Sequence, residues 1–201
     1  IHCHCNGDAS ADMFLDAVEA ALKDSPRDDH RHTIIHGQTL RDDQLKRMAK
    51  LGVTVSFFSA HVYFWGDVHF ETHLGPERAE RISPAKSAER YGVRYTIHND
   101  APVTPTRPLH LMHCAVNRKT ASGRIRGENE KISPLSALRA QTIDAAWQVF
   151  KEHERGSIEP EKRADLVILS GNPMSCDPEK LCEIRVLQTV RNGIPTRKAQ
   201  A

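Results

Sequence analysis

The chain has 201 residues, of which 39% are hydrophobic and 27% are charged, a composition typical of a soluble globular protein. Its 28 lysines and arginines are spread along the chain and nearly balanced by 26 acidic residues, which argues against a nucleic-acid-binding surface. No apolar run approaches the roughly 20 residues that a membrane span needs, so we expect no membrane role.

The five cysteines form no Cys-x-x-Cys pair, and their odd number argues against a disulfide framework. Reduced thiols are the rule in the cytosol, so we expect a cytoplasmic protein. Histidine, the commonest metal ligand, is frequent, with 12 residues. No signal peptide is visible, and a β-like run begins at once with Ile1. We therefore expect the chain to start in the middle of a larger fold.

Four short apolar or β-branched runs alternate with helical patterns in the first part of the chain. The runs cover residues 1–5, 32–36, 52–58 and 94–98. Helical spacing of apolar residues follows at 8–22, 40–51, 75–80, 84–91 and 109–118, whereas residues 61–73 look irregular. This alternation predicts an α/β fold with a parallel sheet, either open or part of a (β/α) barrel.

The last third of the chain has a different pattern. Ser133 and Pro134 are typical of a helix start, and a helical pattern continues over 142–150. A turn at residue 156 then leads into a strand that ends at Leu169. Farther on, Asn192-Gly193 predicts a β-hairpin. We therefore divide the chain into a (β/α) part, residues 1–150, and a small β part, residues 151–201.

Candidate metal ligands stand at the ends of three predicted strands. Side chains alternate along a strand, so His2 and His4 share one face of the first one. His4, His36 and Asp100 all come at carboxyl ends, which lie at one edge of a parallel sheet. Imidazole and carboxylate together bind zinc. The alternatives are structural, hydrogen-bonded histidines and an aspartate that caps the following loop.

Four motifs occur in a fixed order along nearly the whole chain. They are His4-Cys-Asn-Gly-Asp8, Arg31-His-Thr-Ile-Ile-His36-Gly-Gln, Asn99-Asp100-Ala-Pro-Val-Thr-Pro and Gly156-Ser-Ile-Glu-Pro-Glu-Lys-Arg-Ala-Asp165 with the strand after it. Together they resemble the carboxyl-terminal half of a metal-dependent amidohydrolase of family 3, in the branch of N-substituted formamide deformylases and exoenzyme regulatory proteins. Glu161 departs from this pattern, since the family usually has glycine there.

The resemblance implies strands five to eight of a TIM-like (β/α)8 barrel, followed by the carboxyl-terminal strands of a small composite β-sandwich domain. It also implies a hydrolase of non-peptide C–N bonds, in amides or cyclic amides, with one or two divalent metals, expected to be zinc. The implied metal ligands are His4, His36 and Asp100, and Asp100 is also the catalytic proton carrier.

The same resemblance suggests roles around this centre. We expect the metal ligands to be oriented by residues that do not bind the metal themselves, namely His2, His98 and Asn99. We expect a small amide-like substrate to contact His61 and Trp65. The family's first-strand His-x-His pair and fourth-strand bridging ligand have no counterpart, so we expect a fragment with little activity alone. The open edges of half a barrel favour association with another copy or with the missing half.

Two rival functions differ in class. The chain could be a non-catalytic regulatory or binding protein derived from such a barrel, and retention of His4, His36 and Asp100 counts against this. A phosphate-binding α/β domain would need a glycine-rich loop, and the sequence shows none.

Overall fold

A parallel sheet forms the centre of the molecule, and the structure, a computed structural model, describes residues 1–198. Its strands, in spatial order, are β1 (His2–Cys5), β2 (Thr33–His36), β3 (Thr54–Phe57) and β4 (Tyr95–Ile97). All neighbouring strands are parallel, as the β/α alternation predicts. The register aligns His4 with Ile35, Ile35 with Ser56 and Ser56 with Thr96.

Helices connect these strands and continue after them. They are α1 (Asp8–Asp24), α2 (Asp42–Leu51), α3 (Ala60–Val68), α4 (Gly75–Ala79), α5 (Ala85–Arg90), α6 (Pro108–Asn117), α7 (Pro134–Gln141) and α8 (Ile143–Gln148). A π-helical turn, η1 (His69–His73), extends α3, and two 3-10 turns are η2 (Glu128–Glu130) and η3 (Pro178–Glu183). Among the described residues, no helix is both long and apolar enough to cross a membrane.

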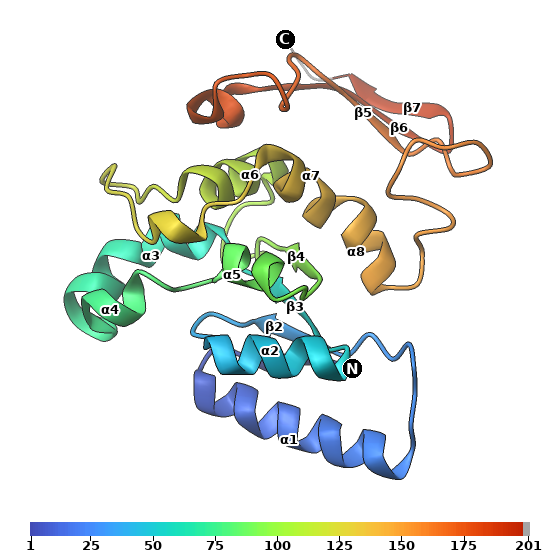
Figure 1. The fold of residues 1–201 in the computed structure, drawn as a ribbon. Coiled ribbons are helices and arrows are strands. Elements are labelled where there is room, and N and C mark those ends of the chain that lie inside the picture. Colours follow the sequence, from blue (N-terminus) through green and yellow to red (C-terminus); the bar gives the residue numbers. More distant parts are fainter. Residues whose placement is uncertain (199–201) are drawn as a thin grey trace.

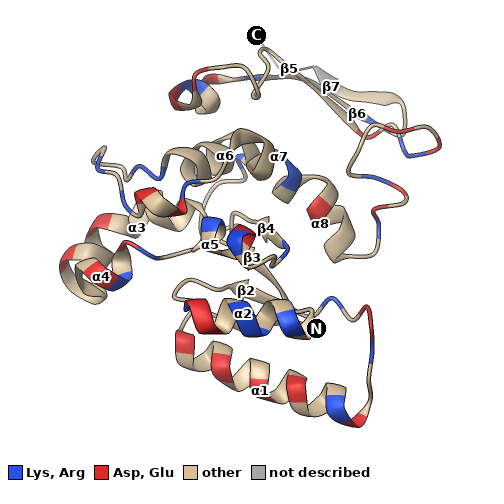
Figure 2. Cartoon of the chain, viewed as in Figure 1, with Lys and Arg blue, Asp and Glu red and all other residues tan. Residues whose placement is uncertain are grey.

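Helices α1 and α2 lie side by side against the sheet (Figure 1). Helix α1 buries Ala11, Leu15 and Val18, which recur at helical spacing along one side. Figure 2 shows acidic residues along most of α1 and basic residues along α2 after its acidic first turn. Arg47 on α2 lies 2.7 Å from Asp16 of α1. The packing of α1 against α2 is therefore stabilised mainly by buried apolar side chains. Exposed ion pairs between the two helices add little to the free energy of unfolding.

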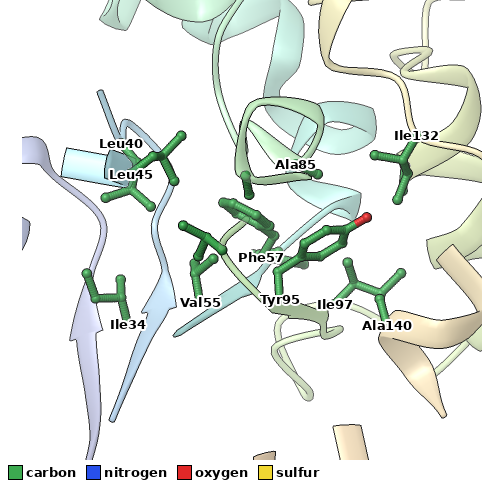
Figure 3. Packing of buried hydrophobic residues seen from close by; sticks show 14 of the residues in the cluster. Ile34, Leu40, Leu45, Val55, Phe57, Ala85, Tyr95, Ile97, Ile132 and Ala140 are labelled. Carbon is green, nitrogen blue, oxygen red and sulfur yellow. The ribbon is translucent and has the colours of Figure 1, made fainter. Parts of the chain in front are cut away.

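The two faces of the parallel sheet differ in chemistry. One face is apolar and packs against the helices, where Ile34, Val55 and Phe57 are fully buried (Figure 3). The other face carries polar side chains at the alternate positions, and these too are buried. They include Thr33, Thr54, Ser56 and Thr96. A hydrogen bond of 2.8 Å joins Thr33 and Thr54 across the strands, so this face satisfies its own polar groups.

A second, antiparallel sheet lies at the carboxyl end, beyond α6 to α8 (Figure 1). Its strands are β5 (Leu166–Leu169), β6 (Val186–Arg191) and β7 (Ile194–Lys198). The predicted hairpin at Asn192-Gly193 is confirmed, with both residues at positive φ. The boundary at residue 150 stays a prediction, and residues 199–201 of the predicted β part lie outside the described residues.

One secondary-structure prediction was wrong. The stretch 61–73, expected to be irregular, forms α3 and η1. Its aromatic and histidine residues do not show an amphipathic pattern, and packing against α6 stabilises the helix instead. Gly66 allows a close approach, because a Cβ there would lie 2.9 Å from the Thr120 methyl group.

Candidate metal centre

The candidate ligands gather at the carboxyl edge of the parallel sheet. His36 is the last residue of β2, and His98 and Asp100 follow β4 directly. Both His36 (φ 78°) and Asp100 (φ 54°) have left-handed backbone conformations. Non-glycine residues adopt this region at a cost of about 1–3 kcal/mol, and such residues cluster at functional sites.

Three side chains are close enough to share one cation. Ligand atoms of His36, His98 and Asp100 all lie within 4.8 Å of one another. His36 is buried, whereas the other two are partly exposed, so the group can be reached from solvent. Two imidazoles and one carboxylate form a donor set that suits zinc or a similar divalent ion. The residues present therefore fit the metal that the family resemblance implies.

His4 lies beside this group and extends it along the sheet edge. Its Nδ1 is 3.0 Å from Nε2 of His36, and Nδ1 of His36 is 3.2 Å from Nε2 of His98. The three imidazoles thus form a continuous hydrogen-bonded row across β1, β2 and β4. The structure brings the predicted ligands into one region, while their binding of a metal stays a prediction.

Burial keeps the imidazoles of His36 and His98 neutral, which is the form that binds metals. Desolvation, followed by the neighbouring His36, lowers the pKa of His98 to about 4. Desolvation is also the largest cause that lowers the pKa of His36, and the Asp100 carboxylate partly opposes it. At neutral pH both rings therefore offer a lone pair without first losing a proton.

The residues predicted to support the ligands differ in their positions. Asn99 stabilises the loop after β4, because its Nδ2 donates a 2.8 Å hydrogen bond to the Pro105 carbonyl oxygen and its own carbonyl accepts from Thr104. His98 lies within the ligand group itself, closer to the centre than we expected. His2 is exposed on β1, on the same face as His4, and its supporting role stays a prediction.

His61 and Trp65 lie on α3 rather than in a loop. The His61 ring stacks on Phe58 at 5.3 Å and lies 4.9 Å from Trp65, and Phe58 in turn stacks on His98 at 5.5 Å. Burial, followed by His69 and His36, lowers the pKa of His61 to about 4. Phe58, His61 and Trp65 therefore form a row of rings that begins at His98, and we call these three residues the aromatic wall. The imidazole of His61 in this wall is neutral at pH 7.

The sequence interpretation missed a second polar pair at this wall. Nε2 of Gln38, two residues after His36, lies 3.2 Å from Nε2 of His69 in η1. The available signal was an amide side chain two residues after a strand-end histidine. The pairing itself depends on the helical course of residues 60–73, which the pattern did not predict.

Comparison with known proteins agrees with this geometry. A family model described as "Amidohydrolase family" matches residues 1–196. The chain belongs to the amidohydrolase family. Its relatives include the N-substituted formamide deformylase of Arthrobacter pascens, which is 32% identical over 95% of this chain and 35% of that protein. The putative amidohydrolase YtcJ of Bacillus subtilis is 29% identical over 94% of this chain and 36% of its own length.

A solved structure is similar as well. An uncharacterized metal-dependent hydrolase from Pyrococcus furiosus aligns with a TM-score of 0.72 and 27% identity, over 87% of this chain and 34% of that one. The α/β fold seen here is thus the fold of amidohydrolase-family proteins. The chain spans about a third of the length of the curated amidohydrolase relatives that it matches.

Proposed function

We propose that this protein is part of a metal-dependent hydrolase that cleaves a non-peptide C–N bond, in an amide or a cyclic amide. The convergence of His36, His98 and Asp100 within 4.8 Å at one strand edge carries the proposal. Membership of the amidohydrolase family and similarity to a formamide deformylase support the bond type. This convergence also favours an enzyme over the non-catalytic alternative.

The proposed ligands are His36 and Asp100 of this group together with His4, whose Nδ1 lies 3.0 Å from Nε2 of His36. Zinc suits these imidazole and carboxylate donors best. A divalent cation bound there would polarise the substrate carbonyl and make water a better nucleophile. We assign proton transfer to Asp100: one carboxylate oxygen takes the proton that the attacking water loses and returns it to the leaving nitrogen. Water and amide thus become a carboxylic acid and an amine.

The aromatic wall would receive the substrate. His61 is neutral at pH 7 and can donate one hydrogen bond to the acyl oxygen, while the Trp65 ring offers an apolar surface. We also propose that β1 to β4 are strands five to eight of a TIM-like barrel. Association with another copy or with the missing barrel half, and a cytoplasmic location, stay predictions.

Metal analysis tests the centre directly. The purified chain is incubated with zinc chloride, dialysed and analysed for bound metal. We expect the chain to retain zinc, although weakly, and expect His36→Asn and Asp100→Asn to lose it. His153→Asn is the matched control, because that side chain is 69% exposed and belongs to a different part of the chain. Equal zinc in all four proteins would contradict the proposal.

A substrate panel tests the chemistry. N-substituted formamides, cyclic amides and esters are incubated with the zinc-loaded protein, and the amine or acid product is measured. We expect the 201-residue chain to be slow alone and a longer protein with the remaining family strands to be active. Asp100→Asn in that longer protein should abolish hydrolysis, and undiminished turnover would refute the role of Asp100.

A further inference from the structure

A polar cavity of about 330 Å³ lies at the amino edge of the parallel sheet. Residues from α5, α7 and α8 and from the start of β4 line it, and they include Glu89, Arg94, Tyr95, Ser136, Arg139 and Asp144. Arg94 directly precedes β4, whereas His98 and Asp100 follow it, so the cavity and the candidate metal centre lie at opposite edges of the sheet. Ligand pockets have volumes of about 300–1,000 Å³, so a ligand of this cavity would be small.

Two guanidinium groups and one carboxylate form a part of the lining in which charges are incompletely paired. Nε of Arg94 lies 3.4 Å from Oδ1 of Asp144, and Nε of Arg139 lies 3.8 Å from Oδ2. Both distances exceed the about 2.7–2.9 Å of a direct charge-assisted hydrogen bond. Burial raises the pKa of Asp144, and Arg139 and Arg94 oppose this only in part. Each of the three groups can therefore still bind an opposite charge.

The surroundings orient these three charged groups. The guanidinium carbon of Arg94 lies 4.1 Å from the centroid of the Trp147 ring, which supports the planar group from one side. Asp144 is in the first turn of α8, and its side chain is 16% exposed. Arg139 on α7 is 56% exposed, so it can move toward a ligand without disturbing the packing. The cavity thus combines two well-held groups with one adjustable one.

A second carboxylate of the lining comes from Glu89 on α5. Its Oε1 accepts a 2.8 Å hydrogen bond from the hydroxyl of the buried Tyr95, and its Oε2 accepts one of 2.7 Å from Lys86. A carboxylate has about four acceptor sites, so Glu89 can also accept from a ligand. Buried Val93 and the Tyr95 ring add an apolar surface. The space beside Gly92 is open, since a Cβ there would meet no atom within 4 Å.

We propose that this cavity binds a small zwitterion, namely an α-amino acid with an apolar side chain. Arg94 and Arg139 would bind its carboxylate, while Asp144 and Glu89 would accept hydrogen bonds from its ammonium group. The two arginines and two acids sum to zero charge, so a ligand with one charge of each sign leaves the cavity neutral. A simple anion would meet two carboxylates, and a simple cation two guanidinium groups, so repulsion disfavours both. The proposal is independent of the metal centre and of the hydrolysis proposed above.

Isothermal titration calorimetry of the 201-residue chain with amino acids tests the ligand class. Alanine, valine, leucine and phenylalanine are titrated at about pH 7 in the presence of a chelator, which prevents hydrolysis of the amide probes. We expect at least one of them to bind. N-acetyl-leucine lacks the ammonium group and leucinamide lacks the carboxylate, so each should bind about 10-fold or more weakly than leucine. Absence of binding by all four amino acids would overturn the proposal.

Variants of the cavity test the place of binding. Arg139→Met and Asp144→Asn should each weaken binding of the best amino acid about 10-fold or more, because each removes a bond to a charged group. Ser136→Phe keeps all four charges but fills the cavity, and it should abolish binding. Arg27→Met is the matched control, since Arg27 is an exposed arginine that does not line the cavity. Thermal melts followed by circular dichroism verify that each variant is folded.

The remaining outcomes each contradict a stated part of the proposal. Unchanged affinity in both Arg139→Met and Asp144→Asn would place the amino acid elsewhere on the chain. Binding of N-acetyl-leucine as tight as that of leucine would identify a plain anion site, and equally tight binding of leucinamide a plain cation site. Either result would refute the zwitterion assignment, whereas loss of the metal centre in His36→Asn should leave amino-acid binding unchanged.

Discussion

The buried, neutral His61 predicts that the protein loses stability in mild acid. In the unfolded chain this imidazole has a pKa of 6.5, while burial on α3, followed by His69 and His36, lowers it to about 4 in the folded protein. At pH values between these two pKa values, His61 binds a proton in the unfolded state but not in the folded state. Stability contributed by the neutral ring is therefore complete above pH 6.5 and falls as the pH drops toward 4.

The size of this effect follows from the two pKa values. A displacement from 6.5 to about 4 corresponds to at most about 3 kcal/mol, of which roughly 2 kcal/mol is lost between pH 7 and 4.5. A domain is stable by only about 5–15 kcal/mol, so the loss is easily measured. Other histidines add to the acid sensitivity, and a variant is needed to isolate His61.

Urea denaturation at pH 7 and 4.5, in the presence of a chelator, provides the measurement. His61→Gln replaces the imidazole by a side chain that does not titrate, so its stability should fall by about 2 kcal/mol less than that of the wild type over this range. His153→Gln, at an exposed position, should behave like the wild type. The reasoning is refuted if His61→Gln and the wild type show the same difference between the two pH values.

Three further predictions concern the elements that position the site. The guanidinium carbons of Arg31 and Arg94 lie over the half-buried Trp147 ring, 4.2 and 4.1 Å from its centroid, so Trp147→Ala should destabilise by about 1–2 kcal/mol in urea denaturation. A double-mutant cycle with Arg31→Met should give a coupling above about 0.5 kcal/mol, and additive effects would contradict the stack. Gly37→Ala should lower the urea midpoint more than Gly92→Ala does. A Cβ at position 37 would lie 2.6 Å from a Val55 methyl group and 2.8 Å from a Leu40 methyl group, whereas a Cβ at position 92 would meet no atom within 4 Å. Equal shifts of the two midpoints would contradict this steric explanation.

Much of the fold follows from local patterns in the sequence. The alternation of β-branched runs and helical spacing predicts the four parallel strands, and Asn192-Gly193 predicts the hairpin. The common edge of the sheet then places His36 and Asp100 together. These features could be predicted because each depends on residues close in the chain, or on a general rule about parallel sheets.

The place of His98 could not be predicted in this way. Its ring is held by a contact with a residue that is distant in the chain: Nδ1 of His98 lies 2.9 Å from the hydroxyl oxygen of Ser56, which is on a neighbouring strand 42 residues away. Arg31 is a similar case: its charge suggests the surface, yet it is 7% exposed and packs between the rings of Trp147 and Phe150. Such contacts depend on distant residues.

The chemical difference between the two faces of the parallel sheet has a consequence for sequence variation. At Val55, Phe57 and Ile97 the side chain fills apolar volume, so only hydrophobic replacements of similar size should be tolerated. At the interleaved positions Ser56 and Thr96, a hydroxyl matters more than volume, so serine and threonine should exchange freely while valine fails. In a saturation library over β3 and β4, the tolerated side chains should therefore alternate from one residue to the next between hydrophobic ones and ones that carry a hydroxyl.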